Sequence, residues 1–453
     1  MPATADLPAA DGHAPGGPDP VRAPTSFTQR SSLLMSAFNP SREFMSWVYQ
    51  LNGKLDVEAL ARAVDDVVAR HDMLRVRFEE GPEGPEQVVT PFRPGVMDIV
   101  RLDDRPKAQG LAAAVKAIET GYRDLSPWDD SRLQATLYLV APKTNVLAIF
   151  VAEALVDGDS GTLVAAEISR AYAAHAGRPE PDLPVPNQES FLRYVLEHPP
   201  RAEVAERSAR HWQELAGVPR GAGRWPTEIG ERSQTRFFKI TVDEWQRMVE
   251  ATPALATTPF VVVLSWLEMA LARVAGAERF MVTSAVSNRR LPVAREMIGS
   301  FIGPVRLTAE VGAHDTLEDV SPRVMAALRE AVVNSIVPVP LAEAMGRAPE
   351  PYTPPVTEVS FFMFAEREGL DLSGVRQRRF RVHTGTRDVL RVNCTPDEEG
   401  GRNFFFTSAS ASPELLSELV DTFRALLDGA VAPSPAEAQV AAVSLGSGAR
   451  PGP

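Results

Sequence analysis

The sequence predicts an α/β fold made of two halves, residues 25–178 and 188–432, and three observations support this. Amphipathic helical segments alternate along the chain with short segments of strand-like periodicity. The chain has 453 residues, which is more than one hydrophobic core usually serves. Residues 179–187 include three prolines in EPDLPVP and are the best linker candidate between the halves.

In the first half, Asp56 suits the N-cap of a helix that runs to about Arg70 with its apolar residues on one face. Leu74, Val76 and Phe78 then alternate with arginines, which is typical of a half-buried strand. A later strand is apolar on both faces, as expected in the centre of a sheet. The further segments are strands at Leu133–Val140 and Val146–Val151 and a helix at Gly161–Ala174.

The second half repeats this alternation. A nearly all-apolar helix is expected at Pro259–Val274, and an amphipathic helix at Glu414–Leu427 closes the half. Glu398–Gly401 is a turn sequence that predicts a hairpin between the last two strands. The remaining segments are a helix at Leu317–Val333 and strands at Phe280–Val286, Val359–Phe364, Val389–Cys394 and Asn403–Ser408.

Composition and charge exclude several classes of protein. The formal charge of −12, with no run of five basic residues, argues against a nucleic-acid partner. The most apolar run begins at Phe260 and is interrupted by Ser265 and Glu268, so it is too short to span a bilayer. The single cysteine, Cys394, cannot form an internal disulfide. We therefore expect a soluble cytoplasmic protein, with a disordered leader at 1–24 and a disordered tail at 433–453.

Six segments occur in an order and spacing that match one superfamily over about 300 residues. They are Pro24–Leu34 (PTSFTQRSSLL, with Thr28 and Gln29), Arg70–Phe78 (RHDMLRVRF), Ala152–Ser160 (AEALVDGDS), Val286–Arg289 (VSNR), Ile298–Ile302 (IGSFI) and Val337–Pro338. Together they resemble the condensation domains of nonribosomal peptide synthetases, which are relatives of chloramphenicol acetyltransferase.

The resemblance implies an architecture and a set of partners. The family fold is a V-shaped pseudo-dimer of two chloramphenicol-acetyltransferase-like lobes with a central tunnel. Acyl or peptidyl carrier proteins dock at its two mouths, and each delivers its substrate on a phosphopantetheine arm. We therefore expect a free-standing monomer that binds no cofactor of its own and meets a carrier protein and a small-molecule acyl acceptor.

The segment Ala152–Ser160 lies where the family has His-His-x-x-x-Asp-Gly-x-Ser, and both histidines are replaced. Ala152 stands at the first histidine and Glu153 at the second, catalytic one. In the family that histidine assists attack of an amine or hydroxyl on a thioester. A carboxylate with an ordinary pKa of about 4.3 is a weak base at neutral pH, but burial can raise its pKa into a useful range. Glu153 is therefore the candidate catalytic residue, and condensation, cyclisation, elimination and thioester hydrolysis all stay open as its reaction.

Other residues of the motif are expected to be structural. The resemblance implies that Asp157 pairs across the lobes with Arg289. Gly158 is expected to supply a backbone conformation that strains other residues, and Ser160 to cap the following helix through its hydroxyl. Gly303 replaces the asparagine that usually follows Phe-Val, and Arg306 lies two positions before the usual arginine.

Loss of both histidines leaves a second interpretation open, in which the chain has no acyl-transfer chemistry and serves as a platform. The recruitment domains of glycopeptide assembly lines resemble condensation domains, depart from the same motif and bind oxygenases. His383 on a candidate strand, Cys394 and Gly303 are possible tunnel-lining residues, although a lone strand histidine or cysteine is more often packed. His71 is expected to be structural.

The remaining motifs give little support to other chemistry. No ligand cluster for a metal, no phosphate-binding glycine loop and no Gly-x-Ser-x-Gly elbow occurs in the sequence. Two arginine-rich stretches, Arg201–Arg210 and Arg376–Arg381, are candidates for docking an acidic carrier protein, or are simply solvated faces.

Overall fold

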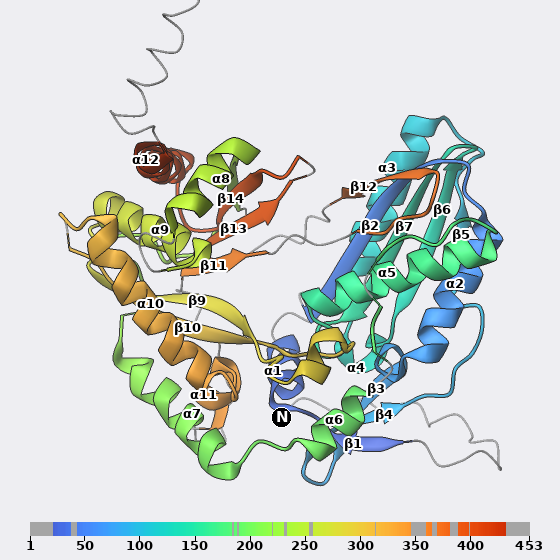
Figure 1. The fold of residues 1–453 in the computed structure, drawn as a ribbon, viewed down its shortest axis with the longest axis horizontal. Helices are drawn as coiled ribbons and strands as arrows, with labels where there is room; N and C mark the ends of the chain where they lie inside the picture. Colours follow the sequence, from blue (N-terminus) through green and yellow to red (C-terminus); the bar gives the residue numbers. More distant parts are fainter. Residues whose placement is uncertain are drawn as a thin grey trace, which may run out of the picture.

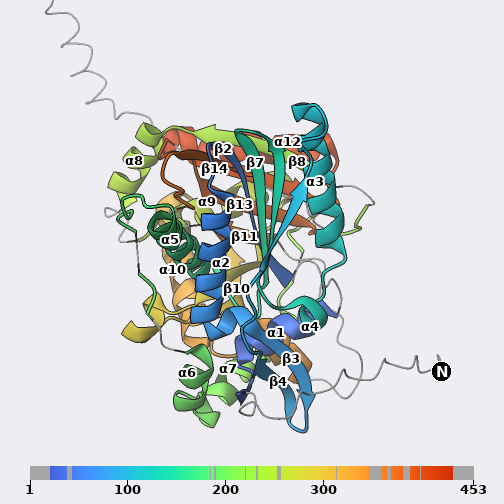
Figure 2. The same ribbon diagram turned by 90° about the vertical axis from the view of Figure 1, so that its right-hand side faces the viewer.

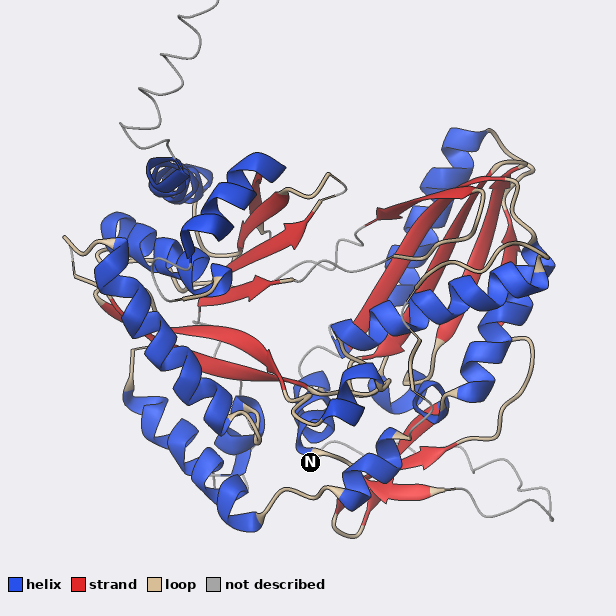
Figure 3. Cartoon of the chain, viewed as in Figure 1, coloured by secondary structure: helices blue, strands red, loops and turns tan. Residues whose placement is uncertain are grey.

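The computed structural model forms two sheet-based lobes arranged as the arms of a V (Figure 1). It describes residues 21–37, 43–183, 185–187, 190–219, 221–230, 233–252, 257–312, 314–345, 359–364, 369–380, 388–397 and 399–431. Helices flank the sheets of both arms, and the arms meet around α1 (Phe27–Ser36) (Figures 1 and 3). The two-lobed α/β architecture expected from the sequence is confirmed.

The first lobe is built on a five-stranded sheet of order β12-β2-β7-β6-β5. Only β5 and β6 are parallel; the other neighbours are antiparallel. The apolar segment expected to be central is β7, and it lies in the middle of the sheet. The strands are β2 (Phe44–Gly53), β5 (Met97–Arg101), β6 (Gln134–Ala141), β7 (Thr144–Ala152) and β12 (Val375–Phe380).

Helices pack on both faces of this sheet (Figure 2). On one face α2 (Val57–Arg70) and α5 (Gly158–His175) bury their apolar sides in a core with Leu51 and Ile149. On the other face α3 (Lys107–Arg123) covers a smaller cluster. Asp56 caps α2 as predicted, because its side chain accepts a hydrogen bond from the backbone of Ala59 at 3.0 Å.

A small three-stranded sheet of order β1-β4-β3 lies below the first lobe. Its strands are β1 (Arg22–Pro24), β4 (Gly84–Val89) and β3 (Val76–Gly81), with a 3₁₀ turn, η2 (Asp72–Arg75), and the short α4 (Pro127–Asp130) nearby. β1 corrects the expected leader at 1–24, since residues 22–24 pair with β4. Residues 1–20 lie outside the described residues.

The second lobe contains a six-stranded sheet of order β10-β9-β11-β13-β14-β8. One face packs against a large apolar core, and α9, the nearly all-apolar helix of the sequence, is buried in it. The strands are β8 (Gln234–Ile240), β9 (Arg279–Ser287), β10 (Ile302–Glu310), β11 (Val359–Met363), β13 (Leu390–Pro396) and β14 (Arg402–Ser408). The predicted hairpin joins β13 to β14, which are antiparallel.

The helices of the second lobe lie mostly on the outer side of its sheet (Figure 1). They are α7 (Ala202–Glu214), η3 (Leu215–Gly217), α8 (Val242–Ala251), α9 (Pro259–Ala275), α10 (Leu317–Asn334), α11 (Val339–Met345) and α12 (Pro413–Val431). No helix in the described part of the chain combines the length and apolar character needed to cross a membrane.

Three segments of the second half belong physically to the first lobe. β12 pairs with β2 at the edge of the first sheet. α6 (Phe191–Glu197) places Phe191 and Leu192 in the first core, and Ala294 of the 3₁₀ turn η5 (Pro292–Glu296) joins them. A boundary at residue 188 therefore does not separate the two lobes, because the chain crosses between them several times.

Candidate functional site

The segment Ala152–Ser160 links the central strand of the first lobe to a helix, as the sequence predicted. β7 ends at Ala152, which is fully buried, and α5 begins at Gly158. Glu153 lies in the turn between them and is half-buried. Its backbone N–H donates to the carbonyl of Glu43 at 2.8 Å, and the N–H of Ala152 donates to the carbonyl of Ser131 at 3.1 Å. The backbone of this turn is thus held from two sides.

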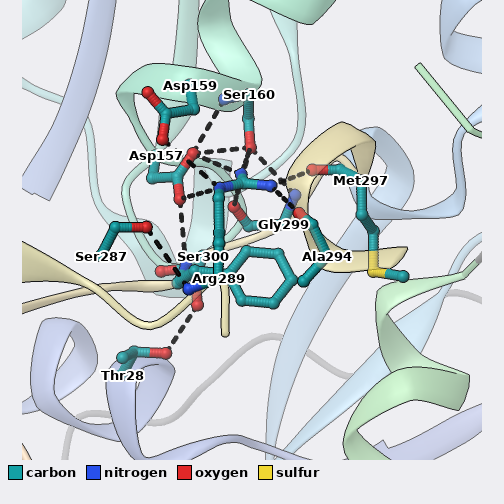
Figure 4. Close-up of polar contacts among 11 residues, drawn as sticks. Thr28, Asp157, Asp159, Ser160, Ser287, Arg289, Ala294, Met297, Gly299 and Ser300 are labelled. Carbon is teal, nitrogen blue, oxygen red and sulfur yellow. Dashed lines mark hydrogen bonds and ion pairs between the residues drawn. The ribbon is translucent and has the colours of Figure 1, made fainter. Parts of the chain in front are cut away.

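Asp157 and Arg289 form a buried, two-pronged ion pair between the lobes, as the resemblance implied (Figure 4). Arg289 Nη2 lies 2.7 Å from Asp157 Oδ1, and Nε lies 3.2 Å from Oδ2. Their side chains are only 6% and 2% exposed. Such a bidentate pair fixes relative orientation as well as charge. It therefore holds the start of α5 against the chain that follows β9.

The guanidinium of Arg289 is also occupied on its other side. Nη1 donates to the backbone carbonyls of Ala294 and Met297, the latter at 2.7 Å. The guanidinium carbon sits 4.3 Å from the centre of the Phe301 ring, in a cation–π contact. With every side of this cation engaged, Arg289 serves as a structural junction and has no free N–H group to direct at a substrate.

Ser160 belongs to the motif segment Ala152–Ser160, here called the signature segment. Its hydroxyl connects this segment to Arg289 and Gly299 at the contact between the lobes, here called the lobe junction. Its hydroxyl accepts from the N–H of Gly299 at 3.0 Å and from Arg289 Nη2 at 2.8 Å. The hydroxyl proton faces the Gly299 carbonyl at 2.8 Å and Asp157 Oδ1 at 2.9 Å. The expected capping role of Ser160 is wrong. Asp157 is the N-cap of α5, because its Oδ1 accepts from the Ser160 N–H at 2.8 Å.

The expectation for Gly158 is also wrong. Gly158 is the first residue of α5 and does not have a positive φ, so it needs no left-handed backbone. Two glycines near this helix start, Gly161 and Gly299, have a steric reason instead. A Cβ atom on Gly161 would lie 2.6 Å from the Trp47 ring, and one on Gly299 would lie 2.3 Å from the Phe191 ring. Both glycines permit close packing around the signature segment.

The first motif anchors α1 at the same junction. Thr28 Oγ1 donates to the carbonyl of Ser300 at 2.7 Å (Figure 4). Gln29 is buried and donates to Gln87 Oε1 at 2.9 Å. Gly303, in β10, is buried where α1 and Pro338 approach the strand, because a Cβ there would lie 3.2 Å from Pro338 and 3.6 Å from Thr28. These contacts place Gly303 at the lobe junction; a role in lining a tunnel stays a prediction.

Other candidates lie away from the signature turn or outside the described residues. Cys394 is fully buried in the second core, where desolvation raises the pKa of its thiol to about 12, so it does not line an open tunnel. His383 lies outside the described residues. His71 is buried and contacts the carboxylate of Glu167, which supports its structural role. Arg306 is buried in β10.

The two arginine-rich stretches lie on different surfaces. Arg201–Arg210 falls mostly in α7, and β12 exposes Arg376, Arg378 and Arg379 at the edge of the first sheet. Carrier-protein docking at either stretch stays a prediction. Among the described residues, no group of three or more His, Cys, Asp or Glu side chains could hold a metal ion.

Two lobes joined at a buried Asp–Arg pair define the fold of a condensation domain, and comparison with solved structures agrees. The first condensation domain of the calcium-dependent antibiotic synthetase, in complex with a substrate analogue, superposes with a TM-score of 0.71 at 20% identity. The match covers 91% of this chain and 98% of that one. The X-domain in complex with OxyB from teicoplanin biosynthesis gives a TM-score of 0.70 at 22% identity, covering 93% and 95%.

Residues 22–348 match the condensation domain family, and the chain therefore belongs to this family. Chondramide synthase of Chondromyces crocatus is 28% identical over 305 residues, which is 65% of this chain and 8% of that protein. Isonitrile lipopeptide synthase of Mycobacterium tuberculosis is 26% identical over 342 residues, or 70% of this chain and 13% of that protein. The chain thus spans a small part of these curated relatives.

Several residues of this site cannot be identified from the sequence alone. Gly299 and Ser300 belong to the Ile298–Ile302 motif, but their sequence does not indicate that their backbone groups bind Ser160 and Thr28. Glu43 lies in no recognisable motif, although its carbonyl accepts the backbone N–H of Glu153. The alternation of apolar residues in Phe44–Gly53 could have revealed β2, but only its pairing with β7 brings Glu43 to the signature turn.

Proposed function

We propose that the chain catalyses acyl transfer from a carrier-protein-bound acyl or peptidyl thioester to an amine or hydroxyl, with Glu153 as the proton acceptor. This chemistry belongs to nonribosomal peptide or hybrid natural-product assembly. The phosphopantetheine arm comes from the carrier protein, and the chain supplies only side chains and backbone. The product is an amide, an ester or a cyclised form of either.

The observation that carries this proposal is the intact frame around the changed residue. The Asp157–Arg289 pair and the Ser160–Gly299 hydrogen bonds fix the beginning of α5, only a few residues after Glu153. A side chain in a turn fixed at both ends has a defined position, which general base catalysis requires.

The proposed step balances in atoms and charge. The nucleophile attacks the thioester carbonyl, a C–N or C–O bond forms, and the carbon–sulfur bond breaks. Glu153 accepts the proton that the amine or hydroxyl loses, and the departing phosphopantetheine thiolate takes that proton back. Glu153 therefore returns to its carboxylate form at the end of each turnover.

The second candidate is a platform that binds a carrier protein or a tailoring enzyme without chemistry. One observation favours it: both histidine positions of the signature motif are replaced, and the first one is a fully buried alanine that cannot transfer a proton. The fold is equally suited to this role, because it is shared with an X-domain that forms a complex with OxyB.

Intact-protein mass spectrometry separates the two candidates. The wild type is incubated with carrier proteins loaded with acyl or aminoacyl groups, and the mass of every carrier is followed with time. Transfer that depends on the protein supports the enzyme. If no loaded carrier loses its acyl group while a carrier or an oxygenase binds tightly in calorimetry, the platform replaces it.

A further inference from the structure

A band of exposed arginines and valines crosses the surface where α7 and α10 run side by side (Figure 1). Arg207 and Arg210, three residues apart on α7, line an open groove of about 440 Å³ together with Val333 of α10. Arg329 lies three residues before Val332 and four before Val333, so it stands between the two valines on α10. The band is here called the α7–α10 surface and consists of Arg207, Arg210, Arg290, Arg329, Val332 and Val333.

Arg290 forms the end of the α7–α10 surface nearest the lobe junction. Its guanidinium donates to the carbonyl of Val332 at 2.7 Å and to Ser335 Oγ at 3.0 Å. Arg290 directly follows Arg289, whose buried ion pair with Asp157 holds the beginning of α5. The α7–α10 surface therefore adjoins the junction that carries the signature segment.

The arginines of the α7–α10 surface have no acidic partner within the described part of the chain. Arg207, Arg210 and Arg329 make no hydrogen bond or ion pair with any described residue. Arg290 contacts only neutral groups, which are the Val332 carbonyl and the side chains of Ser335 and Asn288. In a chain with a formal charge of −12, four uncompensated positive charges thus lie close together.

The acidic side chains that border the α7–α10 surface are fewer than its arginines. Glu214 lines the groove, and Glu330 of α10 lies 3.5 Å from His211, which also lines it. Glu203 and Glu206 lie nearer the beginning of α7 and do not line the groove. Four arginines therefore stand against two glutamates, and the surface is positive on balance.

The two helices are fixed to each other beneath this surface. Trp212 Nε1 of α7 donates to the carbonyls of Val337 at 2.9 Å and Asn334 at 3.1 Å. The hydroxyl of Ser208 donates to the same Asn334 carbonyl, and both Trp212 and Ser208 are fully buried. A surface that is already ordered loses little conformational entropy when a partner binds.

We propose that the α7–α10 surface is the docking site of the acidic carrier protein that delivers the thioester. This inference rests on the acyl-transfer function proposed above, which needs a carrier beside the signature segment. Carrier proteins are usually acidic, so the net charge of −12 repels them while the four arginines attract them. Val332 and Val333, which are 42% and 53% exposed, supply apolar contact within a charged rim, as in other protein interfaces.

The arginines of β12 are the competing site for the same partner. Arg376, Arg378 and Arg379 are also exposed, but they lie on an edge strand, where charged side chains serve to prevent unwanted strand pairing. Among the side chains of β12 that the structure describes, no apolar one is exposed. The α7–α10 surface combines charge with exposed apolar groups and is the better fit to a protein partner.

Carrier binding is measured by isothermal titration calorimetry, which needs no turnover. The probes are holo forms of a panel of acyl and peptidyl carrier proteins. We expect a carrier to bind the wild type, and Arg207→Glu/Arg210→Glu to raise its dissociation constant by at least about tenfold. Arg62→Glu/Arg247→Glu makes the same charge change on exposed arginines of α2 and α8, and it should alter the dissociation constant by about twofold or less.

Two further measurements keep the result independent of how one variant folds. Binding to the wild type should weaken steeply as salt rises from about 0.05 to 0.3 M, because exposed charges are screened. Val332→Ala/Val333→Ala leaves every charge in place, and it should weaken binding by about threefold or more without changing this salt dependence. Wild-type binding that is insensitive to salt would overturn the docking site.

Other outcomes assign the surface differently. Binding that Arg207→Glu/Arg210→Glu leaves intact but Arg376→Glu/Arg378→Glu removes would move the docking site to β12 and overturn this one. Failure of every carrier in the panel to bind the wild type would overturn it as well. Self-association of the wild type that Arg207→Glu/Arg210→Glu abolishes in analytical ultracentrifugation would assign the surface to a second copy of the chain instead.

The transfer assay distinguishes the docking site from the proposed function. Transfer by Arg207→Glu/Arg210→Glu at the wild-type rate, with the carrier well below saturation, would overturn the docking site and leave the function standing. Carrier binding that is lost in this variant, without transfer by the wild type, would leave the docking site standing and remove the function.

Discussion

Arg289 and Asp157, which are 132 residues apart in the sequence, meet in a buried two-pronged ion pair that joins the lobes. The two partners neutralise each other's buried charge, and each has a second role. Asp157 also caps α5, and Arg289 also donates a hydrogen bond to the carbonyl of Met297. The balance of buried charge, the start of α5 and the contact between the lobes therefore all depend on this one ion pair. The signature motif is a structural joint as well as the place of Glu153.

Removing one partner of this pair should destabilise the protein strongly. Arg289→Ala leaves a buried carboxylate without its cation, and we expect a loss of about 3–5 kcal/mol in the free energy of unfolding, measured by urea denaturation. Arg290→Ala is the matched control. Arg290 is exposed and binds Val332 and Ser335 at the surface, so its loss should cost about 1 kcal/mol or less. Equal effects of the two substitutions would refute the role given to Arg289.

Gly299 should tolerate no side chain. Its Cβ would lie 2.3 Å from the Phe191 ring, in a junction already filled by Arg289 and Phe301. We expect Gly299→Ala to destabilise by about 1–3 kcal/mol through overpacking. Gly121→Ala provides the contrast. Gly121 lies in α3 with open space around it, so alanine there should stabilise by up to about 1 kcal/mol. Melting temperatures that move in the same direction would contradict the account.

Glu268 should make stability depend on pH. It is fully buried in α9, its two carboxylate oxygens have no hydrogen-bond partner among the described residues, and burial raises the pKa of its carboxyl well above the usual value despite the attraction of Arg323. Below the unfolded-state pKa the residue is neutral in both states. As pH rises above that value, only the unfolded state ionises, so stability falls by up to about 1.4 kcal/mol per pH unit until the folded-state pKa is reached.

Glu268→Met should remove this loss. We expect the variant to exceed the wild type in melting temperature, with a larger difference at pH 7.5 than at pH 5. Glu278→Met, at an exposed position, should show no such pH-dependent gain. A gain from Glu268→Met that is constant with pH would mean that the carboxyl does not titrate as proposed.

Cys394 should be chemically silent in the folded protein. The thiol is fully buried and its pKa is raised to about 12, so almost no thiolate exists at neutral pH. Because it is the single cysteine of the chain, a maleimide should add no label to the native protein and one label after denaturation. Rapid labelling of the native protein would place this thiol at an accessible surface instead.

The sequence predicts a helix or strand correctly where the residues that determine it lie within that helix or strand. The central strand β7 followed from a run that is apolar on both faces, and the start of α2 followed from Asp56, because both signals lie within the segment itself. The Asp157–Arg289 pair came from a family resemblance; no spacing or periodicity in the chain points to residues so far apart.

Features that depend on contacts between distant parts of the chain do not follow from local sequence patterns. The sequence of β12 is short and rich in arginine, and its place beside β2 depends on a chain crossing between lobes. The sequence predicts Ser160 as the N-cap of α5, three residues after the true N-cap, because Asp157 and Ser160 are both good capping residues and only the structure shows which side chain accepts. The hydrogen bond from the Glu153 N–H to the Glu43 carbonyl depends on the pairing of β2 with β7, two strands about 100 residues apart.

The central claim is that Glu153 carries the proton in acyl transfer, and the most direct test is the transfer rate of Glu153→Gln. General base catalysis contributes about 10²–10⁴-fold, so the rate should fall by at least about 100-fold while the melting temperature changes little. Glu203→Gln, the same chemical change on the exposed face of α7, should transfer at the wild-type rate. Transfer by Glu153→Gln at the wild-type rate would contradict the account.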